Sequence, residues 1–193
     1  MLYNPTVRGR PYTISAQLGF ITYQITLGVA ALGLAREREI GTLEQLMVTP
    51  VRRFELLLGK ALPPALVGMI DFLVLSAVVQ YGFGIPIQGA YWFLSLGSLV
   101  FVLVEVIWGI LVSSLAGTQQ QAILLVFIQA MVDVALSGYL VPVRDMPRVF
   151  GFLAQFVPLH YYLVFVRAVV LKGAGLSDMW PQLLALVALG AVV

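Results

Sequence analysis

The run ISAQLGFITYQITLGVAALGL, residues 14–34, decides the fold, because it holds 21 consecutive residues without a charge. About 20 apolar residues in a helix cross the hydrocarbon core of a bilayer. Backbone N–H and C=O groups in lipid must be satisfied internally, which makes such a run helical. The run is longer than the apolar region of a secretory signal peptide, and it ends in charged residues rather than at a cleavage site. We therefore interpret it as a membrane-spanning helix.

The composition extends this interpretation to the whole chain. Of 193 residues, 61% are hydrophobic and 10% are charged, whereas soluble domains have roughly 45–50% and about 25%. A soluble enzyme would lack the polar surface that it needs, and a net charge of +2 is too small to indicate nucleic-acid binding. With no cysteine and one histidine, disulfides, thiolate metal sites and HExxH zinc sites are excluded. We predict an all-α integral membrane protein, a polytopic helical bundle.

Four further apolar stretches follow the first. They cover residues 63–81, 92–115, 122–140 and 179–193. The double proline at 63–64 fits a helix start, because the first N–H groups of a helix have no partner to lose. Trp92 suits the boundary between membrane and water. We predict five spans, the last of them cut short.

The positive-inside rule does not decide the orientation of these spans. The loop between the first and second spans holds five basic residues, and the segments on the opposite side hold six. The first loop is the densest charged run in the chain, with four acids among its five bases. Residues 141–178, by contrast, are largely apolar and are interrupted by prolines. Charge counting alone leaves both orientations open.

Residues 36–50 of the first loop have the period of an amphipathic helix. Ile40, Leu43 and Met47 fall on one narrow apolar stripe, and Pro50 is expected to end the helix. One interpretation is an interfacial helix that anchors the loop in the membrane surface. The polar face, however, mixes both signs of charge, which suits anionic lipid poorly. The alternative interpretation is a docking element for a soluble partner.

The sequence of this loop resembles the ABC-2-type transport permease family, the membrane subunits of ATP-driven exporters of the multidrug and daunorubicin-resistance kind. The most specific segment is REREIGTLEQL at residues 36–46, with VTP at 48–50 and GK at 59–60. Shorter agreements occur in the family's order and spacing: LSG at 136–138, Pro142, MP at 146–147, Pro158, Tyr161 and LKGAG at 171–175. The resemblance covers about residues 30–180.

The resemblance implies a fold of ABC-2 permease type. Residues 36–50 would be a cytoplasmic coupling helix, and residues 142–172 an outer re-entrant helical hairpin. The first span would correspond to the second of six membrane helices in the family. We therefore expect residues 1–193 to form a single transmembrane domain and to be a fragment. The family's N-terminal helix and outer domain would be absent, and the last helix would break off at Val193.

The resemblance also implies the function of a permease subunit of an ATP-driven ABC exporter that moves an amphipathic or lipid-like substrate. Gly59-Lys60 is followed by Ala61, and Phe54 stands where a P-loop needs its first glycine. ATP and Mg²⁺ are therefore expected on a separate cytoplasmic ATPase subunit, and no catalytic residue, cofactor or metal is expected here. The other expected partners are a second permease subunit, identical or not, and membrane lipid, without nucleic acid. The expected location is the bacterial inner membrane.

Two sets of site residues come from the resemblance. Contact with the ATPase subunit is expected from Glu37, Glu39, Gly41, Thr42, Glu44, Leu46 and Pro50. The re-entrant segment is marked by Pro142, Met146, Pro147, Pro158 and Tyr161. In the same segment we expect His160 to be a hairpin residue, and Tyr161 and Tyr162, like Trp180, to be anchors at the membrane interface.

Three acids lie near the middle of predicted spans. Asp71, Glu105 and Asp133 have no base in their own span, and each costs about 2.5–3.5 kcal/mol on insertion scales, which a mostly apolar span can carry. We expect them to face the bundle interior or a water-filled cavity. One hypothesis gives them hydrogen bonds to polar side chains of neighbouring helices. The other makes them a substrate path or a proton relay, and it underlies an alternative function, a proton-coupled secondary transporter.

Overall fold

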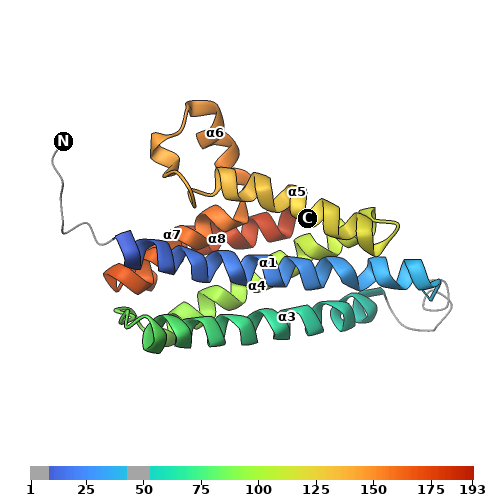
Figure 1. Ribbon diagram of the computed structural model, residues 1–193, viewed down its shortest axis with the longest axis horizontal. Helices are drawn as coiled ribbons and strands as arrows, with labels where there is room; N and C mark the ends of the chain where they lie inside the picture. Colours follow the sequence, from blue (N-terminus) through green and yellow to red (C-terminus); the bar gives the residue numbers. More distant parts are fainter. Residues whose placement is uncertain (1–8, 43–52) are drawn as a thin grey trace.

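The computed structural model describes residues 9–42 and 53–193, and within these ranges the chain is built of helices (Figure 1). The long helices are α1 (Gly9–Ile40), α3 (Arg53–Ala77), α4 (Tyr91–Leu115) and α5 (Gln119–Leu136). A π-helical turn, η1 (Val78–Gly82), continues α3. The C-terminal part contains η2 (Val143–Asp145), α6 (Arg148–Leu153), η3 (Ala154–Phe156), α7 (Pro158–Lys172) and α8 (Leu176–Val192). The predicted all-α fold is confirmed.

Four of the described helices are long and apolar enough to cross a membrane: α1, α3 with η1, α4 and α5. A fifth candidate is the pair Arg148–Phe156 and Pro158–Lys172, whose two parts are bent by 88°. Helix α8 has 17 residues, which is at the short end of what a bilayer needs. The chain is therefore a multi-pass membrane protein.

Helix α1 lies at the centre of the bundle, with α3, α4, α5 and α7 packed against it (Figure 1). Its crossing with α4 is closest at Gly109, where an added Cβ would overlap the Cβ of Ala30. The crossing of α4 with α7 is similar, because a Cβ on Gly97 would overlap the ring of Phe165. Lipid tails are as apolar as the helices, so close contact through small residues is what holds membrane helices together.

Aromatic side chains fill the space between α4 and α7. The rings of Phe101 and Tyr162 are stacked, with centroids 3.8 Å apart, and the hydroxyls of Tyr162 and Ser98 are 2.8 Å apart. Tyr162 is fully buried. The prediction that it anchors the membrane interface is therefore wrong: its ring is a core residue, and its hydroxyl finds a partner inside the bundle.

Two predicted helix boundaries are also wrong. Pro63 and Pro64 lie inside α3, which begins at Arg53. Proline is tolerated inside membrane helices where the freed carbonyls find other partners, so a double proline does not have to start one. Helix α5 ends at Leu136 rather than at residue 140, because Gly138 turns the chain with a φ of +83°.

The helix expected at residues 36–50 is corrected in its described part. Residues 36–40 do not start a separate helix but extend α1, which runs unbroken to Ile40. The chain then leaves the helix at Gly41, whose φ is +79°, a value that favours glycine. Glu44, Leu46 and Pro50 lie outside the described residues.

Candidate functional site

The charged end of α1 is held against α3 by an ion pair between Glu37 and Lys60. Both side chains are partly buried. The backbone N–H of Thr42 donates to the carbonyl oxygen of Glu37 at 3.0 Å, which closes the helix after Gly41. Of the residues expected to contact an ATPase, Glu37 is thus already engaged with a neighbouring helix of its own chain.

The next two residues tie the same end of α1 to the connection between α4 and α5. Arg38 Nη1 donates to the carbonyl oxygens of Ser114 at 3.0 Å and Ala116 at 2.7 Å. Glu39 Oε2 accepts from the backbone N–H and the side-chain amide of Gln119, both at 3.0 Å. Movement of the chain beyond α1 would therefore reach α3, α4 and α5 together.

A further bond joins α1 to α4 just inside this charged end. The hydroxyl of Ser113 accepts from the backbone N–H groups of Leu34 and Ala35, both at 2.9 Å. Ser113 is fully buried. A side-chain bond to helix backbone fixes the axial register of the two helices, since neither can slide without breaking it.

Deeper in the bundle, Asp133 of α5 is bound by Tyr23 of α1. The Tyr23 hydroxyl donates to Asp133 Oδ2 at 2.5 Å, and both side chains are buried. One signal for this partner is visible in the sequence. Tyr23 carries a hydroxyl in the middle of the uncharged run, and a buried tyrosine hydroxyl usually has a hydrogen-bond partner. Asp133 thus has the structural role that the first hypothesis describes.

Glu105 of α4 lies close enough to Asp133 and Tyr23 to interact electrostatically. Its side chain is 1% exposed, and neither carboxyl oxygen has a hydrogen-bond partner among the described residues. A buried carboxyl without partners is costly in a folded protein. The nearby Nε1 of Trp108 is likewise buried and unpaired within the described ranges.

Asp71 of α3 is half-buried and lies beside Thr22 of α1. Its Oδ2 is buried without a hydrogen-bond partner in the described part of the chain. Glu105 and Asp133 therefore lie within electrostatic range of each other and of Tyr23, whereas Asp71 meets α1 at Thr22.

The residues expected in the re-entrant segment lie at its turns. Pro142 precedes η2, Met146 follows it, and Pro147 precedes α6. Pro158 is the first residue of α7, and the Tyr161 hydroxyl donates to the carbonyl oxygen of Gln155 at 3.1 Å. The loop that carries α6 stands off from the bundle (Figure 1). The 88° bend is the geometry of a broken span or a re-entrant loop; re-entry itself stays a prediction.

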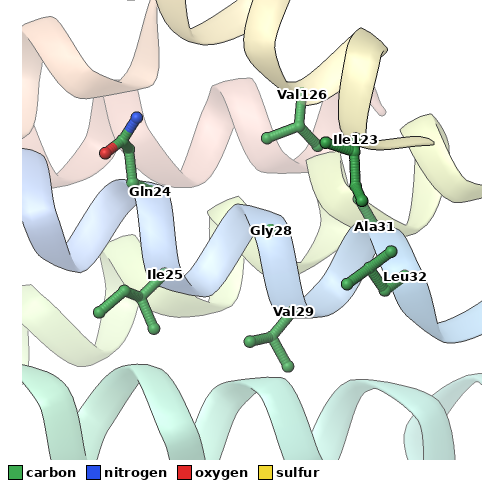
Figure 2. A pocket seen from close by; sticks show the side chains of 8 residues that line it. All are labelled: Gln24, Ile25, Gly28, Val29, Ala31, Leu32, Ile123 and Val126. Carbon is green, nitrogen blue, oxygen red and sulfur yellow. The ribbon is translucent and has the colours of Figure 1, made fainter. Parts of the chain in front are cut away.

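An apolar groove runs between α1 and α5, with a cavity of about 300 Å³. Figure 2 shows its lining, in which Ile123 and Val126 come from α5 and the other side chains from α1. The lining residues are Gln24, Ile25, Gly28, Val29, Ala31, Leu32, Ile123 and Val126. Gln24 is the one polar residue of this set, so the groove suits an apolar ligand with a single hydrogen-bonding group.

The part of the chain that the structure describes offers no cluster of side chains that could bind a metal ion. Within residues 9–42 and 53–193, His, Cys, Asp and Glu do not gather in a group of three that could hold a metal ion.

Comparisons with known proteins agree on one family. A family model described as "ABC-2 type transporter" matches residues 4–171. The "Probable multidrug ABC transporter permease YbhR" of Escherichia coli is 32% identical, over 98% of this chain and 51% of that protein. The "Inner membrane transport permease YhhJ" of Escherichia coli is 30% identical, again over 98% and 51%. "ABC transporter G family member 20" of Dictyostelium discoideum is 26% identical, over 93% of this chain and 26% of that protein.

The chain spans about half the length of the bacterial relatives it matches. No solved structure matches it.

Proposed function

We propose, because this chain belongs to the ABC-2 type transporter family, that it is the membrane-spanning permease subunit of an ATP-driven exporter. The observation that carries the proposal is the family match over residues 4–171. Two relatives that cover nearly the whole chain are named as transport permeases, which supports a subunit that moves a substrate rather than one that catalyses a reaction. ATP and Mg²⁺ belong, in this proposal, to a separate ABC ATPase subunit.

The network at the end of α1 supports a mechanical role. An ATPase that moves the segment beyond Gly41 would pull on Glu37, Arg38 and Glu39, which are bonded to α3 and to the α4–α5 connection. The movement would then pass to the membrane helices as a rigid-body shift. In this arrangement Glu37 and Glu39 transmit the movement from inside the chain, and direct contact with the ATPase falls to Gly41, Thr42, Glu44, Leu46 and Pro50. This end of the bundle is cytoplasmic in the proposal.

The α1–α5 groove supports an amphipathic or lipid-like substrate, because its lining is apolar apart from Gln24. Its location beside exposed apolar side chains of α5 supports a second permease subunit, identical or not, packed on the same side. The names of the bacterial relatives support the inner membrane as its location.

The test uses the full-length protein copurified with its ATPase. Glu44→Arg reverses a charge in the segment proposed to dock, so we expect loss of ATPase copurification and of export of an amphipathic dye from cells. Asp145→Arg makes the same acid-to-base change in η2, outside the docking segment, and should leave both intact. If Glu44→Arg retained both association and export, the docking assignment would be wrong.

The alternative, a proton-coupled secondary transporter, is favoured by one observation, the buried carboxyl of Glu105, which has no hydrogen-bond partner among the described residues. Protons would then drive transport through the intramembrane acids. Collapse of the proton gradient while ATP is maintained separates the two functions. Export that continues under these conditions supports the ATP-driven permease, and export that stops supports the alternative.

A further inference from the structure

A second pocket lies at the opposite end of α1, where the end of α7 and the start of α8 meet the first turns of α1 (Figure 1). Its volume is about 560 Å³, within the range of about 300–1,000 Å³ typical of small-molecule sites. The residues that matter for its chemistry are Tyr12, Val164, Arg167, Lys172, Asp178 and Met179. Unlike the α1–α5 groove, this pocket carries charge.

Arg167 is the unusual residue of this pocket. Its Nη1 donates to the carbonyl oxygen of Gly138 at 3.1 Å, and its guanidinium carbon lies 4.0 Å from the ring centroid of Tyr12, which orients the plane of the group. Nε and Nη2 are buried, and neither has a hydrogen-bond partner among the described residues. Buried donors of a charged group are normally paired, so this edge of the guanidinium lacks an acceptor.

Acids within residues 9–42 and 53–193 do not supply that acceptor. Asp178 lines the pocket, but its carboxylate accepts from the backbone N–H of Gly175 at the start of α8. Within the described ranges, Asp178 makes no ion pair with Arg167 or Lys172. Residues 1–8, which precede α1, contain one arginine and no acid. The pocket therefore has one more positive than negative side chain.

We infer that this pocket binds the phosphate group of an anionic amphiphile. Nε and Nη2 of arginine form a planar fork that matches two oxygens of one phosphate, and these are the two donors without partners among the described residues. Both atoms are closed to solvent in this structure, so binding requires the partly buried side chain of Arg167 to swing toward the pocket. Lys172, which is exposed at the same pocket, provides a second cation. Val164 and Met179 provide an apolar wall beside it, which suits the acyl or glycerol part of a lipid. A free phosphate ion shares the headgroup chemistry but does not use that wall.

The test measures thermal unfolding of the purified full-length protein in detergent as dioleoylphosphatidylglycerol, dioleoylphosphatidylcholine or inorganic phosphate is added. We expect phosphatidylglycerol to raise the unfolding midpoint and phosphatidylcholine, which is zwitterionic, to raise it much less. Arg167→Gln should weaken the apparent affinity for phosphatidylglycerol at least about tenfold, because two charge-assisted hydrogen bonds are lost. Lys172→Gln should weaken it by a smaller factor and leaves Arg167 in place.

The matched control is Arg144→Gln, which removes one positive charge from an exposed side chain in η2 and should leave the lipid response unchanged. Lys172→Gln keeps the test decisive if Arg167→Gln fails to fold. A midpoint raised by inorganic phosphate as strongly as by phosphatidylglycerol would support the phosphate site and identify its ligand as the soluble ion. Equal responses to the two lipids, or a phosphatidylglycerol response that survives both substitutions, would overturn the inference. ATPase copurification is measured separately, so failure here leaves the proposed function standing.

Discussion

Helices α4 and α5 are both apolar and each carries one acid, yet α4 is buried in the bundle to a much larger extent than α5. Half of the apolar window of α4 is buried, whereas 17% of that of α5 is. Helix α4 is packed against α1, α3, α7 and α8, and α5 mainly against α1. The difference follows from small residues at the crossings of α4, such as Gly97, Ser98 and Gly109. Hydropathy inserts a helix in the membrane, but close backbone approach decides whether it becomes core.

For the acids of the two helices the order is reversed: the acid on the less buried helix has a hydrogen-bond partner, and the acid on the more buried helix has none among the described residues. Asp133, on the peripheral helix, is bound by the Tyr23 hydroxyl, while Glu105, on the central helix, has no hydrogen-bond partner among the described residues. An acid with a partner contributes to the packing of its helix. An acid without one lowers stability, and a group that lowers stability is a candidate for function.

The largest effect is expected at the α1–α4 crossing. Gly109→Leu forces a side chain into the space of Ala30 and the α1 backbone, and overpacking of this kind costs about 3 kcal/mol or more. Thermal unfolding of the purified protein should show the loss, and the yield of folded protein should fall. Gly109→Ala should show a smaller loss in the same direction.

The matched control for that pair is Gly28→Ala in α1. A Cβ added at Gly28 meets nothing within 4 Å, because this glycine faces the α1–α5 groove. Alanine should leave stability unchanged or raise it by about 0.5–1 kcal/mol through helix propensity. Equal destabilisation by the two alanine substitutions would contradict the distinction between the closely packed α1–α4 crossing and the looser α1–α5 contact.

A smaller loss is expected when the acid of α5 loses its partner. Tyr23→Phe removes one hydroxyl and with it one hydrogen bond to the buried carboxyl of Asp133, which costs about 1–3 kcal/mol. Tyr81→Phe removes a hydroxyl from a side chain that is 81% exposed and should change the unfolding midpoint little. If the two variants unfold at the same temperature, the Tyr23–Asp133 bond does not stabilise α5.

Replacement of Glu105, the acid of α4, should change stability less than the loss of the Tyr23 hydroxyl does. Glu105→Gln replaces a buried carboxyl that has no partner among the described residues by a neutral group of the same shape, so stability should stay within about 1 kcal/mol of the original. Export of an amphipathic dye, measured on the same variant, then reports function separately from folding. A large loss of stability would mean that Glu105 is held by a partner outside the described ranges.

Much of this fold could be predicted from the sequence. The apolar runs at residues 14–34 and 92–115 predicted the middle of α1 and nearly all of α4, because insertion in lipid depends mainly on composition and length. Helix boundaries predicted from local chemistry were less accurate. Pro63 and Pro64 were expected to start a helix but lie inside α3, because neighbouring groups can replace the backbone hydrogen bonds that proline removes.

The partners of the site residues could not be predicted in the same way. Core-facing and lipid-facing positions are both apolar in a membrane protein, so periodicity does not show which face of α5 meets α1. Tyr23 and Asp133 lie 110 residues apart in the chain, and the fold alone brings them together. The sequence does not reveal either that Nε and Nη2 of Arg167 lack a partner among the described residues, because this depends on which groups the surrounding helices place beside them.

The smallest effect on stability is expected at the outward face of α5, where Ile128 is 59% exposed. The sequence contains no cysteine, so Ile128→Cys gives a single thiol and should change stability by less than about 0.5 kcal/mol. If a second permease subunit packs on this face, mild oxidation in membranes should join two chains by a disulfide. Leu103→Cys places the same thiol on the exposed side of α4, where Leu103 is 45% exposed, and should give few such dimers. Comparable cross-linking from both positions would mean that the exposed face of α5 is lipid-facing, like that of α4, and that the subunits pair elsewhere.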